Sequence, residues 1–130
     1  MSVPAKQAAL TLEQRRAADA WQCAQEAQSK GYVNLAKGLP ALIMNSGLLQ
    51  VMAFLEEKGG SESQKHCRVL GQHLRSWLHA RFPLVPAEFR GFMEAMMGAD
   101  AATFREVTAE AFAWLRWVRQ IAPVVAKGPG

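Results

Sequence analysis

The sequence predicts an all-α fold, a compact bundle of five to six helices in one domain over residues 1–130. Apolar residues recur at helical spacing along most of the chain, and no segment alternates polar and apolar residues for long enough to form a strand. Hydrophobic residues make up 50% of the chain, which is enough for a real core. The helical spacing of apolar residues is absent from residues 1–10 and 123–130, which are predicted to be flexible tails.

The most apolar stretch, residues 38–58, is predicted to form a helical hairpin at the centre of the bundle. It carries no charge before its last three residues. Residues 45–47 (Asn-Ser-Gly) indicate a tight break between a helix that ends near Met44 and a second helix over 48–58. Because Pro40 and this break interrupt the run, it is too short for a membrane span, and a buried hairpin is expected instead. Apolar side chains such as Leu42 and Phe54 are expected in its core.

The other helices are predicted from caps and breaks. Thr11 and Gln14 fit a capping box, Gly31 is expected to end the first helix, and Pro123 is expected to end the last. The predicted spans are residues 11–30, 61–82, 87–97 and 101–122.

Composition limits the classes of function. The formal net charge is +4 and the sequence pI is near 9.4, which permits nucleic acid as a partner without requiring it. The N-terminus has no signal-peptide pattern, so a cytoplasmic protein with no membrane contact is expected. Cys23 and Cys67 are expected to be free thiols in a reducing compartment, with a disulfide left open.

No catalytic or metal-binding motif is recognisable. The sequence lacks a phosphate loop, HExxH, GxSxG and a dinucleotide fingerprint. His66 and His73 are seven residues apart, about 10 Å along one helix, which is too far to share an ion. Glu106 and Glu110 are expected on a solvated face rather than in acid–base catalysis. The sequence therefore predicts no enzyme, no metal site and no cofactor.

Two stripes of positive charge form the candidate functional surface. The first is expected opposite the core face of helix 61–82 and consists of Lys65, Arg68, Gln72, Arg75 and His79. The second is expected opposite the core face of helix 101–122 and consists of Arg105, Phe112, Arg116 and Arg119. Cations beside an aromatic ring fit contacts with phosphates and bases. For each stripe an ordinary solvated face, with Phe112 covered by another helix, is the alternative.

Two sets of residues resemble a known family. The first set is Leu39-Pro40, Ile43, Gly47-Leu48, Ala53-Phe54-Leu55 and Lys58. The second set is Phe104-Arg105, Thr108, Glu110-Ala111, Leu115, Trp117-Val118-Arg119 and Ala122. In order and spacing they resemble the small-subunit family of the type III-B CRISPR effector, the Cmr complex, over about residues 31–122. Ser46 and Gln120 depart from the family pattern, which usually has Asn and a second basic residue at these positions.

The resemblance implies a non-catalytic structural subunit of an RNA-guided antiviral complex. It implies stacking of several copies beside the repeated backbone subunit and the large subunit, with non-specific contacts to guide and target RNA. Of the matched residues, Lys58, Arg105 and Arg119 are basic and are carried over as RNA-binding candidates. The two stripes add Lys65, Arg68, Arg75 and Arg116.

A helical protein–protein adaptor without direct nucleic-acid contact is the alternative function. Phe112 and Trp117 would then be interface hot spots, with the arginines as rim charges. A DNA-binding regulator is disfavoured, because the break at residues 45–47 joins two apolar helices with no basic recognition face.

Overall fold

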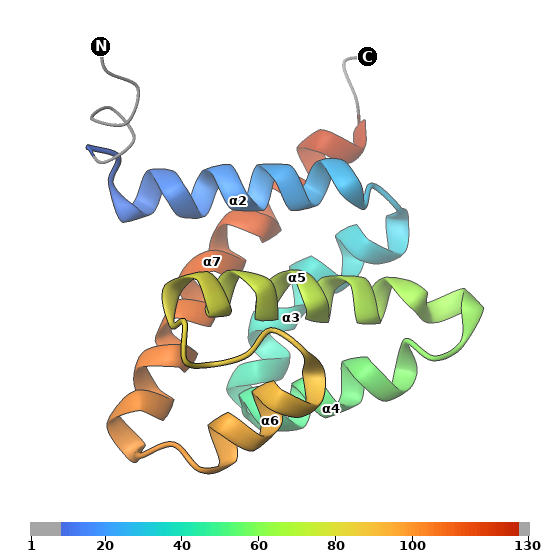
Figure 1. The fold of residues 1–130 in the computed structure, drawn as a ribbon. Coiled ribbons are helices and arrows are strands. Elements are labelled where there is room, and N and C mark those ends of the chain that lie inside the picture. Colours follow the sequence, from blue (N-terminus) through green and yellow to red (C-terminus); the bar gives the residue numbers. More distant parts are fainter. Residues whose placement is uncertain (1–8, 128–130) are drawn as a thin grey trace.

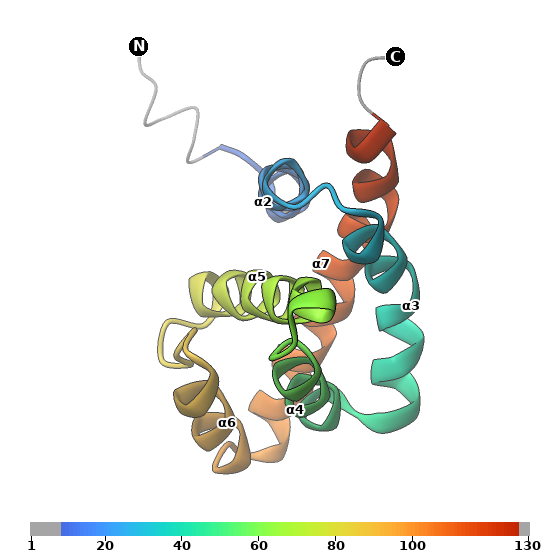
Figure 2. The same ribbon diagram turned by 90° about the vertical axis from the view of Figure 1, so that its right-hand side faces the viewer.

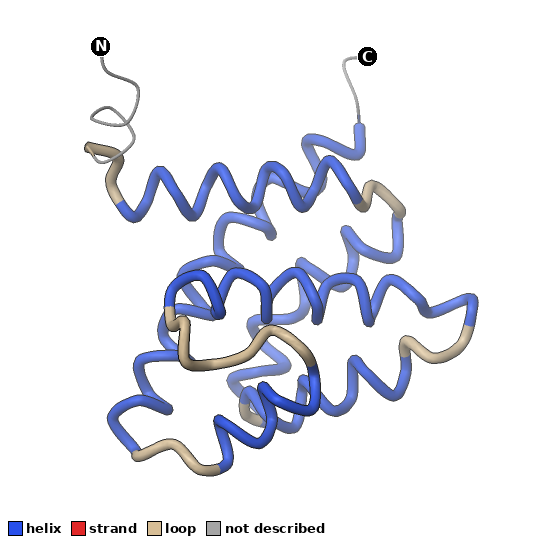
Figure 3. The backbone as a smooth tube through the Cα atoms, viewed as in Figure 1, coloured by secondary structure: helices blue, strands red, loops and turns tan. Residues whose placement is uncertain are grey.

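The structure of the chain, a computed structural model, describes residues 9–127. This part forms six α-helices and one 3-10 helix and contains no strand (Figures 1 and 3). The elements are α2 (Leu12–Glu26), α3 (Lys30–Ser46), α4 (Leu48–Lys58), η1 (Glu62–Gln64), α5 (Lys65–Arg81), α6 (Phe89–Met97) and α7 (Ala101–Lys127). The predicted all-α bundle is confirmed. Of the two predicted tails, residues 1–8 and 128–130 lie outside the described part.

Helix α7 makes the most extensive packing contacts, and α5 packs against the largest number of other elements. α7 packs against α2, α3 and α5, and α5 also packs against α3, α4 and α6. Figure 2 shows α5 between α2 on one side and α4 and α6 on the other. Buried side chains from all six helices join in one hydrophobic core. None of the described helices is long and apolar enough to cross a lipid bilayer.

The predicted hairpin is present, and its turn depends on a glycine. Gly47 ends α3 and precedes α4 with φ of 87°, the one positive φ among the described residues. A side chain at Gly47 would meet no atom within 4 Å, so the backbone angle, not space, requires glycine.

One side of this hairpin is exposed, which corrects the prediction that Leu42 and Phe54 lie in the core. Leu42 is 38% exposed and Phe54 is 46% exposed, whereas their neighbours Ile43 and Leu55 are 3% and 0% exposed. Successive residues in a helix point about 100° apart, so only one residue of each pair faces the core. A continuous run of apolar residues in the sequence does not show which of them face the core and which face solvent.

Gly31 lies inside α3 and does not end the first helix as predicted. α2 stops at Glu26, and Ser29 caps α3 by accepting a hydrogen bond from the Tyr32 N–H at 3.1 Å. A Cβ at residue 31 would lie 2.6 Å from the ring of His66, so glycine is needed here for close packing between helices.

Pro123 also lies inside a helix, so the predicted end of α7 and the start of the second tail are wrong. α7 continues to Lys127, and the buried Ala122 and Val125 hold its last turns against the core. Proline lacks only one helical N–H, and packing on both sides of it offsets that loss.

Two helix starts differ from the prediction by a few residues. Ser61 makes no side-chain cap, and η1 precedes α5, which begins at Lys65. α6 begins at Phe89, because Glu88 caps it by accepting hydrogen bonds from two backbone N–H groups, those of Arg90 and Gly91.

The two sides of the hairpin are expected to respond differently to truncation. Leu55→Ala should lower the free energy of unfolding by about 2–5 kcal/mol, because it leaves a cavity in the core. The matched change at an exposed site, Phe54→Ala, should cost about 1 kcal/mol or less. Urea denaturation measures both, and equal losses would contradict the observed orientation of α4.

Candidate functional site

The basic stripe predicted along α5 is broken at Arg75. This residue is only 5% exposed, so its predicted outward orientation is wrong. Its Nε donates a hydrogen bond to the Ala87 carbonyl at 2.9 Å, and its guanidinium lies 5.5 Å from the centre of the Phe89 ring. Burial lowers the pKa of Arg75, and the negative charge of Glu56 opposes this shift. Arg75 therefore links α5 to the start of α6 and is not available to RNA.

Three other residues of this stripe, Lys65, Arg68 and His79, are exposed but already have partners. Lys65 forms an ion pair with Glu62 at 3.2 Å. Arg68 donates its Nε to the Glu56 carbonyl at 2.7 Å and packs directly against the backbone of the α4–α5 turn. The Nδ1–H of His79 donates to the Val85 carbonyl at 2.8 Å. These side chains hold turns in place, which reduces their value as an RNA-binding surface.

The α7 stripe is different, because its cations are exposed and free of ion pairs. Arg105, Arg116 and Arg119 are exposed, and none forms a salt bridge with another described residue. Arg116 and Arg119 are one turn apart, whereas Arg105 lies about 16 Å before Arg116 along the helix. Lys127, eleven residues after Arg116, lies on the same face and is also exposed.

Lys127 was missed because Pro123 was expected to end the helix. The signal that could have found it is the continued apolar period at Val118, Ala122 and Val125. The third basic residue carried over from the resemblance, Lys58, is also exposed, and its Nζ lies 5.7 Å from the centre of the Phe54 ring.

Phe112 and Trp117 are not free rings on an outer face, which corrects the predicted position of Phe112. Both are half-buried and pack against the core. The Trp117 Nε1–H also donates to the Glu13 carboxylate at 3.1 Å, linking α7 to α2. The alternative in which Phe112 is covered by neighbouring helices describes its position better.

The most connected polar group is Glu110, which was expected on a solvated face and is instead 4% exposed. It accepts hydrogen bonds from Arg16 Nε and Nη2 at 2.7 and 2.8 Å and from Trp77 Nε1 at 2.9 Å. Arg81 Nε lies 3.3 Å away. Burial alone would raise the pKa of Glu110, but the hydrogen bonds from Arg16 and Trp77 and the two arginine charges outweigh it and hold the pKa below its ordinary value. The carboxylate therefore stays charged inside the bundle.

A signal for the burial of Glu110 was present in the sequence. It lies three residues after Val107 and four before Trp114, on the face of α7 that carries the buried apolar residues. An acid at such a position needs partners from other helices, and nothing in the local sequence identifies them.

A second polar group lies beneath α2, around His73. The Tyr32 hydroxyl lies 2.8 Å from His73 Nδ1, and Glu26 Oε1 lies 3.2 Å from His73 Nε2. A neutral ring that donates from Nε2 and accepts at Nδ1 satisfies both contacts. Burial is the main cause of a lowered pKa for His73 and of a raised pKa for Tyr32. Tyr32 has no exposed surface, and this chain of groups joins α2, α3 and α5.

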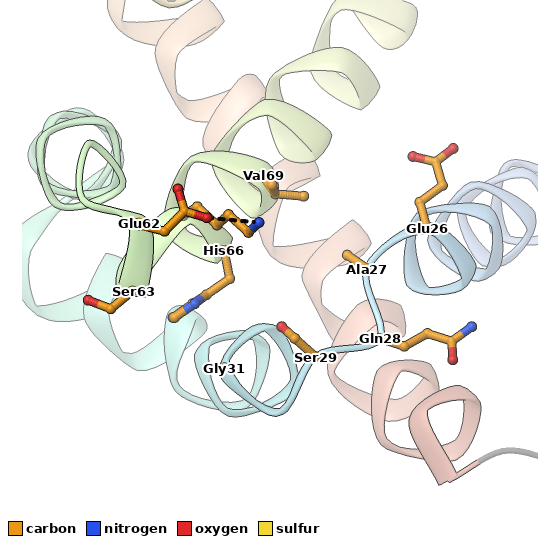
Figure 4. A pocket seen from close by; sticks show the side chains of 10 residues that line it. Glu26, Ala27, Gln28, Ser29, Gly31, Glu62, Ser63, His66 and Val69 are labelled. Atoms are coloured by element: carbon orange, nitrogen blue, oxygen red, sulfur yellow. Dashed lines mark ion pairs between the residues drawn. The ribbon is translucent and has the colours of Figure 1, made fainter.

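A pocket of about 500 Å³ that includes several polar residues in its lining lies between the α2–α3 connection and the start of α5 (Figure 4). Figure 4 shows Glu62 on one wall and the His66 ring directed toward Gly31. Glu62 forms its ion pair with Lys65 on this wall. Ser29, on the opposite wall, already caps α3. No lining hydroxyl is paired with a base, so this pocket lacks the geometry of nucleophilic catalysis.

The cysteines and histidines do not assemble into a metal site or a disulfide. Cys23 and Cys67 are buried and free, as expected, and burial raises the pKa of both thiols. Within residues 9–127 no three His, Cys, Asp or Glu side chains are placed to hold one ion.

Comparison with protein families decides what kind of protein carries this architecture. Residues 12–125 match the family model described as CRISPR-associated protein (Cas_Cmr5). The chain belongs to this Cas_Cmr5 family. It is the small-subunit family of the type III-B (Cmr) CRISPR complex, so the resemblance found in the sequence is confirmed. The chain is therefore a subunit of a Cmr complex, in a family of structural subunits.

Glu110→Gln in this Cas_Cmr5 chain is expected to lower the free energy of unfolding by about 3–5 kcal/mol, because it leaves two arginines with an uncharged partner. Glu106→Gln, one turn away and exposed, is the matched control and should change stability by about 0.5 kcal/mol or less. Chemical denaturation at neutral pH measures both variants. Similar losses for the two would show that the Glu110 contacts contribute little.

Acid is expected to destabilise the fold partly through His73. Because burial lowers its folded-state pKa, the unfolded chain binds a proton at higher pH than the folded chain. The stabilisation is present above the ordinary His pKa and is lost as pH falls from about 7 to 5. Melting temperatures across this range should fall less steeply for His73→Gln than for the wild type or the His66→Gln control. Identical slopes would contradict the assignment.

Proposed function

We propose that this chain is a non-catalytic subunit of the Cmr complex that contacts the guide–target RNA backbone through α7. The contact surface, named here the α7 basic face, consists of Arg116, Arg119 and Lys127. The observation that carries the proposal is that these three cations are exposed and form no ion pair with any described residue. Backbone phosphates are bound through charge of this kind, without reading of base sequence.

The surroundings of the α7 basic face support an anionic partner. α7 has two acids: Glu106 lies ten residues before Arg116, and Glu110 is turned into the core, where its charge is paired with Arg16 and Arg81. No acidic residue of α7 therefore lies beside Arg116, Arg119 or Lys127. The cations of the α5 stripe differ, because Lys65, Arg68 and Arg75 each form an ion pair with an acidic residue of the protein. Lys58, Lys65 and Arg68 remain exposed, and we propose them as secondary RNA contacts.

The finer assembly follows the family resemblance and is part of the proposal. Several copies would stack in a short filament beside the repeated backbone subunit and near the large subunit, so that each copy adds its α7 basic face to one groove. Non-catalytic action is supported by the structural use of the polar side chains: Ser29 caps a helix, while His73 and His79 hold interhelical or turn contacts. The adaptor alternative loses support because Phe112 and Trp117 pack internally.

Reversing charge on the α7 basic face tests this function. In the assembled complex, Arg116→Glu with Arg119→Glu should weaken target-RNA capture equally for unrelated sequences. The slope of log affinity against log salt should fall by roughly 1 for each lost phosphate contact. Arg15→Glu with Arg90→Glu is the matched control, because it changes charge equally at exposed, unpaired residues on other helices.

Two outcomes would contradict the proposal. One is RNA capture equal to that of the control complex. The other is loss of the subunit from the complex while the RNA affinity of the remaining complex is unchanged, which would indicate that the arginines bind a neighbouring protein.

A further inference from the structure

A mainly apolar hollow lies at the end of the molecule where α4, α6 and α7 meet (Figure 1, near the α6–α7 connection). It has a volume of about 570 Å³. Its apolar walls come from Leu49 near the start of α4, Met96 and Met97 at the end of α6, and Phe104 in the first turns of α7. The only charged side chain in its lining is Arg105.

The apolar groups of this hollow are only partly covered by the protein itself. Met97 is 66% exposed, and Leu49 and Phe104 are half-buried against the core. A free Cas_Cmr5 chain therefore leaves an apolar concavity in water, and covering it would be favourable in proportion to the area removed from solvent. Methionine side chains are flexible and adapt to differently shaped apolar partners.

Arg105 gives the hollow a charged rim. It forms no salt bridge with a described residue. The acid at the start of α7, Asp100, is occupied as a helix cap and accepts the Thr103 N–H at 2.8 Å. Because Arg105 lines the hollow, we assign it to this site rather than to the α7 basic face.

We propose that the hollow is a docking site for a helical segment of another protein subunit of the complex. The segment inserts one large apolar side chain, such as Leu, Met or Phe, between Met97 and Phe104. It also carries an Asp or Glu one turn away, which pairs with Arg105. The i, i+3 or i, i+4 spacing of a helix places an anchor and an acid on the same side, matching the apolar wall and the cationic rim.

A protein segment fits these walls better than a nucleobase does. A base carries hydrogen-bond donors and acceptors along its edges, and the lining offers no polar side chain other than Arg105. Inserting a base would leave those edges without partners, which costs free energy, whereas an apolar side chain has none to satisfy. The proposal rests on membership of the complex and is independent of RNA contact at Arg116 and Arg119.

Incorporation of variants into the complex tests the docking site. Met97→Asp places a carboxylate in the apolar wall, and Arg105→Glu reverses the rim charge. Each should reduce the amount of chain recovered with the other subunits several-fold after RNase treatment, with the melting temperature of the isolated chain unchanged because both residues are exposed. The matched controls are Leu84→Asp, at a residue 95% exposed in the α5–α6 connection, and Arg90→Glu on α6. Wild-type recovery of both test variants would overturn the proposal.

A crosslink identifies the occupant. Met97→p-benzoylphenylalanine, irradiated in the assembled complex, should crosslink to a peptide of a different subunit that has an Asp or Glu within four residues of a large apolar residue. The same photoreactive group at Leu84 is the control. A crosslink to RNA, a crosslink to a second copy of this chain, or no crosslink above the control would each overturn the proposal. None of these results bears on the α7 basic face, whose test measures RNA capture.

Discussion

The buried carboxylate of Glu110 fixes how α7 sits in this bundle. It joins α7 to Arg16 on α2, which is 94 residues away in sequence, and to Trp77 and Arg81 on α5. Removing a charge from water is costly, and several directed donors are required to offset that cost. Because these donors come from two other helices, the rotation of α7 about its axis is determined by them. Arg119 is nine residues further on, half a turn round the helix, so the inward position of Glu110 directs Arg119 into solvent.

Carboxylates on α2 also accept hydrogen bonds from donors on another helix. Three of the four tryptophans, Trp77, Trp114 and Trp117, donate their indole N–H groups to carboxylates. The acceptors for the latter two are Asp19 and Glu13, both on α2. Large rings thus provide apolar area for the core and a polar group that pairs with an acid. These hydrogen bonds hold the acids against the fold, whereas Arg116, Arg119 and Lys127 form no ion pair with a described residue.

The sequence was informative about local structure and much less so about partners. The existence and order of the helices, the break at Gly47 and the cap at Thr11 follow from backbone chemistry that acts within a few residues, and these were predicted correctly, whereas several helix ends were not. Gly31 and Pro123 each permit two interpretations, as a helix end or as a residue within a helix, and only packing distinguishes them. Arg75 and Glu110 have ordinary helical spacing, and their burial depends on partners such as Ala87 and Arg16, which helical periodicity cannot identify. Candidate surface residues were therefore the least predictable part.

One helix consequently serves three purposes at different places on its surface. The 27 residues of α7 span roughly 40 Å at 1.5 Å per residue. Its inward face carries the charge that holds α2 and α5, its first turns line an apolar hollow with a cationic rim, and its second half presents cations to solvent. Because a helix of this length is stiff and is held on three sides by α2, α3 and α5, the distance between its two outward features is nearly constant. Under the two proposals, α7 would therefore keep a protein neighbour at one end and nucleic acid at the other at a nearly fixed separation.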